Sequence, residues 1–332
     1  MDASGARGNM KIGLTLGKFA PFHKGHEYLI SCALKEMDEV IVVVYNASET
    51  TDIPTRVRAN WIKSIFPKVR VILAEDGPQV TGYTKDIIDT QNEYLKKKLK
   101  HINVDTFYSS ENYGEYVSTA LKCKNRIVDI SREQISISAT DIRENVVKHR
   151  DFLSPVVFNS IKPYYYFLGG PSTGKSTITL LAAETFGGSY CEEYGREYWM
   201  KHQKKHRLSM KDLEKIAFSQ NELELTRSNI QMNYTFCDTN TITTLAYSIY
   251  YFNKSSKKLL QIVEQSLYKY KNVFLCNDDF PFDDTWDRSG IGSREKLQEI
   301  NIELLQKYQI KYSLLSGTIE NRLEQIKGVI NA

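Results

Sequence analysis

A glycine-rich loop near the midpoint of the chain constrains the fold more than any other feature. The stretch Tyr164–Thr177 reads YYYFLGGPSTGKST, in which Gly169, Gly174, Lys175 and Ser176 fill the pattern G-x-x-x-x-G-K-[ST]. In this pattern backbone N–H groups close around phosphate oxygens, the lysine reaches the β- and γ-phosphates, and the serine hydroxyl can ligate Mg²⁺. A chance match is the alternative, but the aromatic run before the loop and the apolar run ITLLAAETF after it favour a nucleotide-binding P-loop.

The loop supplies the first candidate residues. Lys175 is a catalytic candidate, and Ser176 is a candidate for both phosphate and metal binding, with the anion placed on the N-terminus of the following helix. The other phosphate-binding candidates are Gly169, Gly170, Pro171, Ser172, Thr173, Gly174 and Thr177.

Length and composition indicate a two-domain globular protein. A chain of 332 residues exceeds the roughly 100–200 residues of one domain. No apolar run approaches the roughly 18 residues of a membrane span and no signal segment opens the chain, so we expect a cytoplasmic protein without a membrane partner. Five cysteines without a C-x-x-C pair indicate reduced thiols, and a net charge of +4 is too small to imply a nucleic-acid partner.

Both halves show alternating strands and helices. Before the loop, the pattern predicts a Rossmann-like α/β domain with a parallel sheet over residues 10–150. After it, the pattern predicts a P-loop kinase domain over residues 160–332, whose parallel sheet is also covered by helices. The segment around Pro155 lacks periodicity and is the expected linker. Residues 1–9 are small and polar, and we expect a flexible extension or a tag remnant.

Two histidines mark the loop after the first strand. His23 and His26 lie at the expected N-terminus of a helix, with Gly25 between them. Imidazoles there meet the positive end of the helix dipole and can donate hydrogen bonds to a polyphosphate. Zinc binding is a rival interpretation, weakened because no third or fourth ligand stands at metal-site spacing. A purely structural role of the two histidines is a further interpretation that stays open.

A second motif, ISATDIR, lies at the other end of the same half. Ser138 and Thr140 offer hydroxyls and helix-start amides, and Arg143 offers a planar cation suited to phosphate. Alone, the motif also fits an ordinary helix cap. Together, the two motifs indicate a nucleotide site.

GKFAPFHKGH and ISATDIR resemble the signature of the nucleotidyltransferase superfamily that includes nicotinamide mononucleotide adenylyltransferases. The resemblance implies that an incoming phosphate attacks the α-phosphorus of ATP, which requires no general base. Trp61 lies in a segment that resembles a helix beside the nicotinamide pocket, and both stacking on the pyridinium ring and core packing stay open for it. The residues that the resemblance implies for catalysis and ATP binding are His23, His26, Gly17, Lys18, Phe19, Ser138, Thr140 and Arg143.

Acidic residues follow two strands of the second half. Glu193, Tyr194 and Arg196 lie in EEYGREYW, where a strand ends and a helix starts. Asp238 ends the apolar run YTFCD and is placed like an acid that orients Mg²⁺-bound water. Phosphoryl transfer to a hydroxyl calls for a carboxylate that orients it or accepts its proton, and both Glu193 and Asp238 are candidates. Tyr194 and Arg196 are candidates for substrate binding.

A lid is predicted at residues 277–296, NDDFPFDDTWDRSGIGSREK, which are rich in turn formers and charge. Arg288 and Arg294 are candidates to close over the transferring phosphoryl group. A solvated surface loop is an equally open interpretation of each arginine.

The second half is similar to the ribosylnicotinamide kinase domain of the NadR family, in which this kinase follows a nicotinamide mononucleotide adenylyltransferase. The matching pieces are GGPSTGKST, EEYGREY, FCDTNTITT and the lid. We expect no helix-turn-helix of the kind that some members carry in front, which argues against a repressor. The lid also departs from the family, because it reads FDDTWDRSG where a tighter Asp-Gly turn is usual.

The resemblance implies a bifunctional NAD salvage enzyme. Its second domain would phosphorylate nicotinamide riboside with ATP, and its first would transfer an adenylyl group from ATP to nicotinamide mononucleotide, giving NAD and pyrophosphate. Mg²⁺ is the expected cofactor, ATP the co-substrate and NAD a product. The alternative is an NAD- or ATP-binding sensor with one or both sites inactive. Whether the chain forms homo-oligomers stays open.

Overall fold

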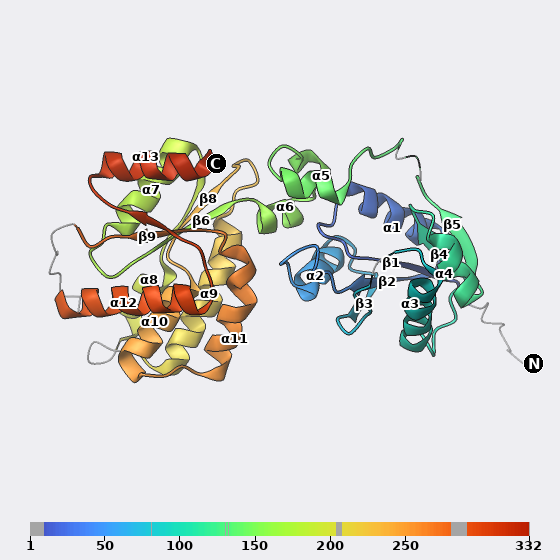
Figure 1. Cartoon of the computed structure of the whole chain (residues 1–332), viewed down its shortest axis with the longest axis horizontal. Coiled ribbons are helices and arrows are strands. Elements are labelled where there is room, and N and C mark those ends of the chain that lie inside the picture. Colours follow the sequence, from blue (N-terminus) through green and yellow to red (C-terminus); the bar gives the residue numbers. More distant parts are fainter. Residues whose placement is uncertain are drawn as a thin grey trace, which may run out of the picture. The chain divides into compact units, whose positions relative to one another are not determined.

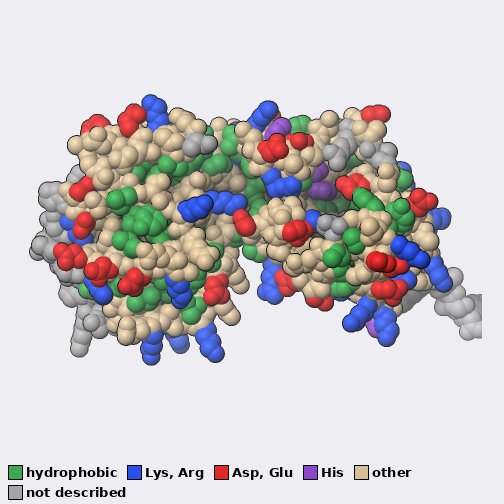
Figure 2. Space-filling model, in the orientation of Figure 1, with side chains coloured by type: hydrophobic (Ala, Val, Ile, Leu, Met, Phe, Trp, Pro, Cys, Tyr) green, Lys and Arg blue, Asp and Glu red, His purple; other side chains and the backbone are tan. Residues whose placement is uncertain are grey.

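The computed structural model describes residues 10–80, 82–129, 131, 133–203, 208–279 and 291–331, with the side chains of residues 291 and 292 left aside. The chain divides between Phe158 and Asn159 into two compact units, which we call unit 1 and unit 2 (Figure 1). Among the described residues, the helices are too short or too polar to cross a membrane. Basic and acidic side chains are interspersed over the face drawn in Figure 2.

Unit 1 is built on a parallel sheet in the strand order β3-β2-β1-β4-β5. Its central strands carry apolar side chains on both faces, and residues 40–44 of β2 are all buried. The strands are β1 Ile12–Gly17, β2 Glu39–Tyr45, β3 Arg70–Ala74, β4 Thr106–Ser109 and β5 Lys124–Ile127. The helices are α1 Lys24–Glu36, α2 Thr55–Ile65, α3 Lys85–Lys98, α4 Gly114–Leu121, α5 Ala139–Glu144 and the 3₁₀ turn η1 Arg150–Phe152.

The strand order places a switch point at the carboxyl ends of β1 and β4. The chain runs from β1 through β2 to β3 on one side of β1, and then crosses to β4 on the other side. Ligands of open parallel sheets bind beyond such a point. The loop from β1 into α1 begins there and ends at His23, the cap of α1, and His26 lies in the first turn of that helix. The fold therefore sets the predicted nucleotide motif at the edge of the sheet where a ligand is expected.

Unit 2 is also built on a parallel sheet, in the order β10-β9-β6-β8-β7. The strands are β6 Tyr164–Leu168, β7 Ser189–Cys191, β8 Thr235–Asp238, β9 Asn272–Cys276 and β10 Ser313–Leu315. The helices are α7 Lys175–Phe186, α8 Tyr194–His202, α9 Met210–Arg227, α10 Thr241–Phe252, α11 Lys257–Ser266, the 3₁₀ turn η2 Leu267–Lys269, α12 Ile291–Lys307 and α13 Ile319–Ile330. The predicted fold class of two helix-covered parallel sheets is confirmed.

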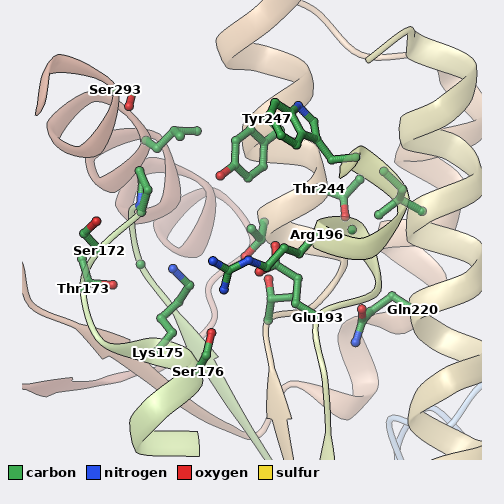
Figure 3. A pocket seen from close by; sticks show the side chains of 18 of the residues that line it. Ser172, Thr173, Lys175, Ser176, Glu193, Arg196, Gln220, Thr244, Tyr247 and Ser293 are labelled. Atoms are coloured by element: carbon green, nitrogen blue, oxygen red, sulfur yellow. The ribbon is translucent and has the colours of Figure 1, made fainter. Parts of the chain in front are cut away.

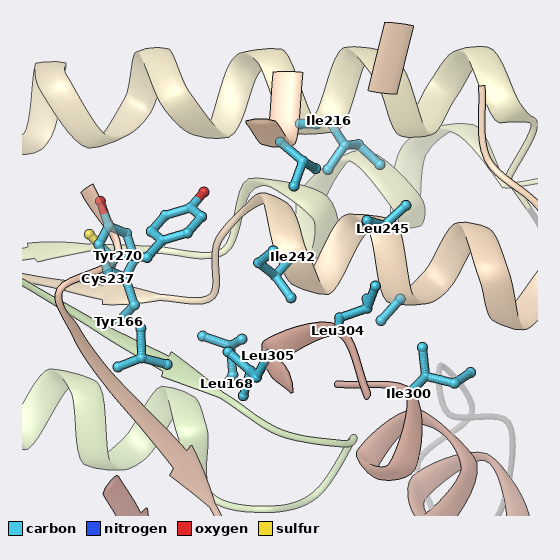
Figure 4. Packing of buried hydrophobic residues seen from close by; sticks show 14 of the residues in the cluster. Tyr166, Leu168, Ile216, Cys237, Ile242, Leu245, Tyr270, Ile300, Leu304 and Leu305 are labelled. Carbon is cyan, nitrogen blue, oxygen red and sulfur yellow. The ribbon is translucent and has the colours of Figure 1, made fainter. Parts of the chain in front are cut away.

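The aromatic strand β6 forms the centre of unit 2, and all five of its residues are buried. Alternate side chains of a strand point to opposite faces of its sheet. Tyr166 and Leu168 accordingly pack in one hydrophobic cluster with helices α10 and α12 (Figure 4). Tyr165 and Phe167 pack in a second cluster with α7 and α13. Because β6 is buried on both faces, its carboxyl end is fixed in the sheet, and the P-loop begins directly after that end.

Two features differ from the sequence expectation. Helix α4 and strand β5 were not predicted, and the four residues of β5 are all exposed at the edge of the sheet, which leaves no apolar alternation to detect. The expected linker around Pro155 instead contains a helix, α6 Pro155–Ile161. Proline stands at its first position, where a missing N–H costs nothing and the fixed φ favours the helix.

A buried ion pair crosses the interior of unit 2. The Lys269 Nζ donates to Glu224 Oε2 at 3.0 Å, and the Tyr166 hydroxyl donates to the same oxygen at 3.2 Å. Glu224 is 0% exposed. Burial raises the pKa of the Glu224 carboxyl, and Lys269 opposes that rise. Because each charge compensates the other inside the protein, the loss of one leaves the other uncompensated.

We predict that Glu224→Gln lowers the free energy of unfolding of unit 2 by about 3 kcal/mol, because it leaves the Lys269 ammonium buried without its counter-charge. Native-state hydrogen exchange resolved by peptide measures this for unit 2 alone. The control is Glu299→Gln, which breaks an exposed pair with Lys296 and is expected to change the same quantity by under about 0.5 kcal/mol. Equal effects of the two changes would contradict a stabilising role for the buried ion pair between Glu224 and Lys269.

Candidate functional sites

The histidine motif of unit 1 forms the cap of α1. The backbone N–H of Gly25 donates to His23 Nδ1 at 3.1 Å, and the N–H of His23 donates to His26 Nδ1 at 3.3 Å. Since both Nδ1 atoms accept, the neutral rings carry their protons on Nε2. The ring centroids lie 3.8 Å apart. The pair thus has a structural function as a cap and also holds two Nε2–H donors at the start of a helix.

Arg143 connects the second motif to the first. Its Nη1 donates to the carbonyl of Ala20 in the β1–α1 loop, and its Nη2 donates to Thr140 Oγ1 at 2.9 Å. Ser138 caps α5, with its Oγ accepting from the Asp141 N–H at 3.1 Å. The helix-cap interpretation of this motif therefore holds, and the cap also aims Arg143 at the loop that carries the histidines.

These elements border a cavity of about 580 Å³, within the range of small-molecule sites. The sequence-predicted residues that line it are Gly17, Lys18, Phe19, His26 and Arg143. Residues that line it without having been predicted include Tyr45, Asn46, Glu49, Glu111 and Tyr113. They come from the ends of neighbouring strands, and only their position at strand ends could have indicated them.

Two residues of α2 do not line the cavity of unit 1. Trp61 is 2% exposed and does not belong to the cavity lining, which favours core packing over stacking on a ring. Arg58, which sequence reasoning missed, is 1% exposed and donates to the backbone carbonyls of Lys18 and Tyr45. Burial lowers the pKa of the Arg58 guanidinium to about 10, and Glu49 acts in the opposite direction. Arg58 therefore fixes the start of the β1–α1 loop.

The P-loop of unit 2 has the backbone geometry of an anion site. Gly169 and Gly174 have φ values of +146° and +77°, in the region that favours glycine. A Cβ on Gly170 would come within 2.5 Å of the Arg294 carbonyl oxygen, so α12 closes tightly on the loop. The Lys175 Nζ donates to the Gly170 carbonyl at 2.7 Å. The loop thus presents its amides at the N-terminus of α7.

A cavity of about 250 Å³ opens over this loop (Figure 3). The predicted residues that line it are Gly169, Pro171, Ser172, Thr173, Gly174, Lys175, Ser176, Thr177, Glu193 and Arg196. In Figure 3 the Arg196 side chain extends toward Lys175, with Glu193 beside it. Gly170 belongs to the P-loop but does not line the cavity, and its N–H donates to Gln298 Oε1 at 2.8 Å. Tyr194 packs against the hydrophobic core of unit 2.

Asp238 lies beneath the P-loop rather than in the cavity wall. It ends β8 and is 2% exposed. Burial raises the pKa of its carboxyl, against the lowering effects of the Lys175 ammonium and of the neighbouring Ser176 side chain. Its Oδ1 atom is buried without a hydrogen-bond partner in the described part of the chain. An orphaned carboxylate oxygen beside a P-loop serine fits a Mg²⁺ site completed by water and phosphate.

The described residues contain no cluster of three or more His, Cys, Asp or Glu side chains that could hold a metal alone.

Of the two lid arginines, only Arg294 is described. It lies on α12 and is 6% exposed, and its Nε and Nη2 atoms have no hydrogen-bond partner among the residues that the structure describes. A buried guanidinium with unused donors is costly unless a ligand supplies acceptors. Arg288 and most of the predicted lid lie outside the described residues.

The far end of the unit 2 cavity was not predicted. Trp199, Tyr247 and Tyr251 line the cavity, and Figure 3 places Tyr247 across it from the P-loop. The Thr239 and Thr243 hydroxyls nearby are buried without partners within the described residues, and Thr239 has a φ of 81°, rare for a β-branched residue. The cavity therefore has a P-loop end and an aromatic end, and its lining includes two threonines with unused hydroxyls.

Two family models match the chain, one in each unit. Residues 14–145 match the model described as cytidylyltransferase-like, and residues 164–322 match the model described as an AAA domain. The first match contains both motifs of unit 1, and the second contains the P-loop.

Curated relatives extend over nearly the whole chain. The trifunctional NAD biosynthesis/regulator protein NadR of Escherichia coli K12 is 26% identical over 336 residues, covering 91% of this chain and 78% of the relative. The protein of the same description from Salmonella typhimurium LT2 is 25% identical, covering 92% of this chain and 79% of the relative. The phosphopantetheine adenylyltransferase of Fusobacterium nucleatum subsp. nucleatum is 33% identical over 139 residues, covering 34% of this chain and 82% of that protein.

Solved structures show the same two-part fold. A crystal structure of NadR protein in complex with NAD and AMP-PNP matches with a TM-score of 0.63 and 21% identity, covering 97% of this chain and 96% of that chain. A structure of NadR protein in complex with NR matches with a TM-score of 0.64, 22% identity and the same coverage.

Proposed function

We propose that this chain, with a cytidylyltransferase-like first unit and a P-loop second unit, is a member of the NadR family and makes NAD from nicotinamide riboside in two steps. The domain over residues 160–332 phosphorylates the riboside with ATP. The domain over residues 10–150 then transfers an adenylyl group from a second ATP to nicotinamide mononucleotide. The observation that carries the proposal is the pairing of two separate cavities in one chain, one lined by His26 and Arg143 and the other by the P-loop.

The two ends of the unit 2 cavity support a riboside as acceptor. A pyridinium ring is flat and cationic, and aromatic side chains such as Trp199 and Tyr247 attract such a ring by about 0.5–2 kcal/mol. The buried threonine hydroxyls and the Glu193 carboxylate offer hydrogen bonds to a sugar. The P-loop lies across the same cavity, so a riboside held at the aromatic end directs its 5′-hydroxyl toward the terminal phosphate of ATP.

In the kinase step the riboside 5′ oxygen forms a bond to the γ-phosphorus, the bond from that phosphorus to the β–γ bridging oxygen breaks, and ADP leaves. The hydroxyl proton passes to Glu193, the carboxylate that faces the cavity. Lys175 and the P-loop amides stabilise the negative charge on the transferring group. Ser176 and Asp238 would hold Mg²⁺, which when bound neutralises phosphate charge.

In the adenylyl step a phosphate oxygen of nicotinamide mononucleotide bonds to the α-phosphorus of ATP, and the bond to the leaving pyrophosphate breaks. A phosphate nucleophile is already ionised, so this step needs no proton acceptor. The Nε2–H groups of His23 and His26 and the guanidinium of Arg143 donate to phosphate oxygens as charge moves onto the pyrophosphate.

The test of the proposed substrates measures each step separately. Purified protein receives Mg²⁺ and ATP with nicotinamide riboside or with nicotinamide mononucleotide, and parallel reactions contain riboflavin or 4′-phosphopantetheine. We expect the mononucleotide from the first reaction and NAD from the second, with no turnover of the other acceptors. Binding of ATP or NAD without turnover would favour the alternative of a nucleotide sensor, and turnover of 4′-phosphopantetheine would reassign unit 1.

We predict that Glu193→Gln lowers kcat for riboside phosphorylation by about 10²-fold, because the amide keeps the size of the side chain but accepts no proton. The Michaelis constant for ATP is expected to stay nearly unchanged, which steady-state kinetics measures alongside kcat. The matched control is Glu197→Gln on α8, the helix that begins directly after Glu193, where the carboxylate pairs with Lys201 on the surface. Full activity of the Glu193 variant would assign proton transfer to another group.

A further inference from the structure

We infer that Arg322 of α13 is a positioning residue for the P-loop, although it lies outside the cavity and was not indicated by any motif. The inference rests on the proposed kinase function of unit 2 and assigns a further residue to it. Arg322 is 0% exposed. In the sequence it lies in NRLEQIKG, which resembles an ordinary charged helix face.

The guanidinium of Arg322 joins three backbone segments behind the loop. Its Nη1 donates to the Thr173 carbonyl at 2.9 Å, its Nη2 to the Asn277 carbonyl at 3.2 Å, and its Nε to the Gly317 carbonyl at 3.3 Å. Nη2 also forms an ion pair with Asp279, whose other carboxylate oxygen accepts from the Gly317 N–H at 2.6 Å. The P-loop is thereby tied to the end of β9 and to the turn before α13.

The contact with Thr173 determines which way one peptide of the P-loop faces. In a trans peptide the carbonyl and the following N–H point in opposite directions. Because Arg322 holds the Thr173 carbonyl behind the loop, the N–H of Gly174 is directed away from Arg322, toward the front. Gly174 lines the cavity. Arg322 therefore orients a backbone donor toward bound phosphate without touching the phosphate.

Burial makes this contact strong and specific. A hydrogen bond from a charged donor contributes more than a neutral one, and the planar fork of arginine fits several carbonyls at fixed angles. Gly174 has a φ of +77°, and a glycine has many alternative backbone conformations when its neighbour is released. Loss of the guanidinium should therefore let the Thr173–Gly174 peptide rotate, which would reduce phosphate binding.

The test compares Arg322→Gln and Arg322→Lys with Lys162→Met. Lys162 is also a buried cation of unit 2, 2% exposed, but it binds the carbonyls of Asn229 and Met232 at the opposite end of β6. All proteins carry His26→Ala, so that binding at unit 1 is suppressed, and a Lys175→Ala protein defines the P-loop contribution. Calorimetry measures the affinity for Mg²⁺·AMP-PNP, and kinetics measures the Michaelis constants for ATP and riboside.

Arg322→Gln is expected to weaken Mg²⁺·AMP-PNP binding at least roughly 10-fold, with Arg322→Lys in between and Lys162→Met within about twofold of the parent. The Michaelis constant for riboside should stay unchanged, which a general loss of structure would not allow. If Arg322→Gln unfolds unit 2 in hydrogen exchange, Arg322→Lys provides the comparison. Equal affinities of the Arg322 and Lys162 variants would overturn the inference, whereas absence of any Lys175-dependent binding would overturn the kinase function itself.

Discussion

Replacement of Lys175 by alanine is expected to lower the rate of riboside phosphorylation by about 10³-fold and to leave adenylyl transfer unchanged. In the proposed mechanism the ammonium of Lys175 reaches the phosphates, and the Gly170 carbonyl that it contacts keeps it at the mouth of the loop. Alanine cannot replace that charge while γ-phosphoryl transfer builds negative charge on the phosphates. The two rates are measured separately, with nicotinamide riboside and with nicotinamide mononucleotide as acceptors.

The control for this change is Lys296→Ala, which removes an exposed lysine of the same unit and should alter neither rate. If the two sites are separate, the Lys175 variant keeps adenylyl transfer while it loses riboside phosphorylation. Loss of both activities to the same extent would mean that one site serves both reactions, or that the change disrupts the whole chain.

Replacement of His26 by alanine is expected to produce the reverse pattern, with adenylyl transfer lowered by about 10³-fold and riboside phosphorylation unchanged. His26 lines the cavity of unit 1 and carries the Nε2–H that is directed to phosphate in the proposed mechanism. Its Nδ1 also accepts the N–H of His23, so alanine removes a helix cap along with the donor.

His26→Asn separates these two functions. An asparagine side-chain oxygen can still accept at the cap, but no donor then stands at the place of Nε2. We expect normal stability of unit 1 and adenylyl transfer nearly as low as in the alanine variant. His101→Ala, at an exposed position of the same unit, is the control. Recovery of adenylyl transfer in His26→Asn would reduce the histidine to a structural cap, the alternative that the sequence left open.

The fold was predictable where the sequence has strong local signals. The unbroken aromatic run of β6 followed by a glycine loop, and the apolar run of β2, can be buried only inside a sheet covered on both faces. The family resemblance, drawn from the histidine motif, ISATDIR and the P-loop together, is confirmed by relatives that cover most of the chain. These signals are local, so a single sequence is sufficient to read them.

The rest of the sites depends on which distant residues meet in space. Trp199 and Tyr247 lie on different helices and are unremarkable in sequence, yet they line the same cavity. Trp61 has the chemistry of a ring-stacking residue, but its position on the inner face of α2 buries it. Arg322 lies 149 residues from the P-loop carbonyl that it binds. Pairings of this kind are set by tertiary packing and leave no periodic or motif signal in a single chain.

Transfer of label from [γ-³²P]ATP into NAD, with unlabelled nicotinamide riboside as the acceptor, tests whether both reactions occur in sequence on this chain. Phosphorylation by unit 2 places the labelled phosphate on the mononucleotide, and adenylyl transfer by unit 1 then retains it in NAD, so we predict one labelled phosphate in each NAD formed. Chromatography separates NAD from labelled pyrophosphate and ATP. If NAD is not formed, or forms without label, the chain does not carry out the two reactions in sequence and the proposed function is contradicted.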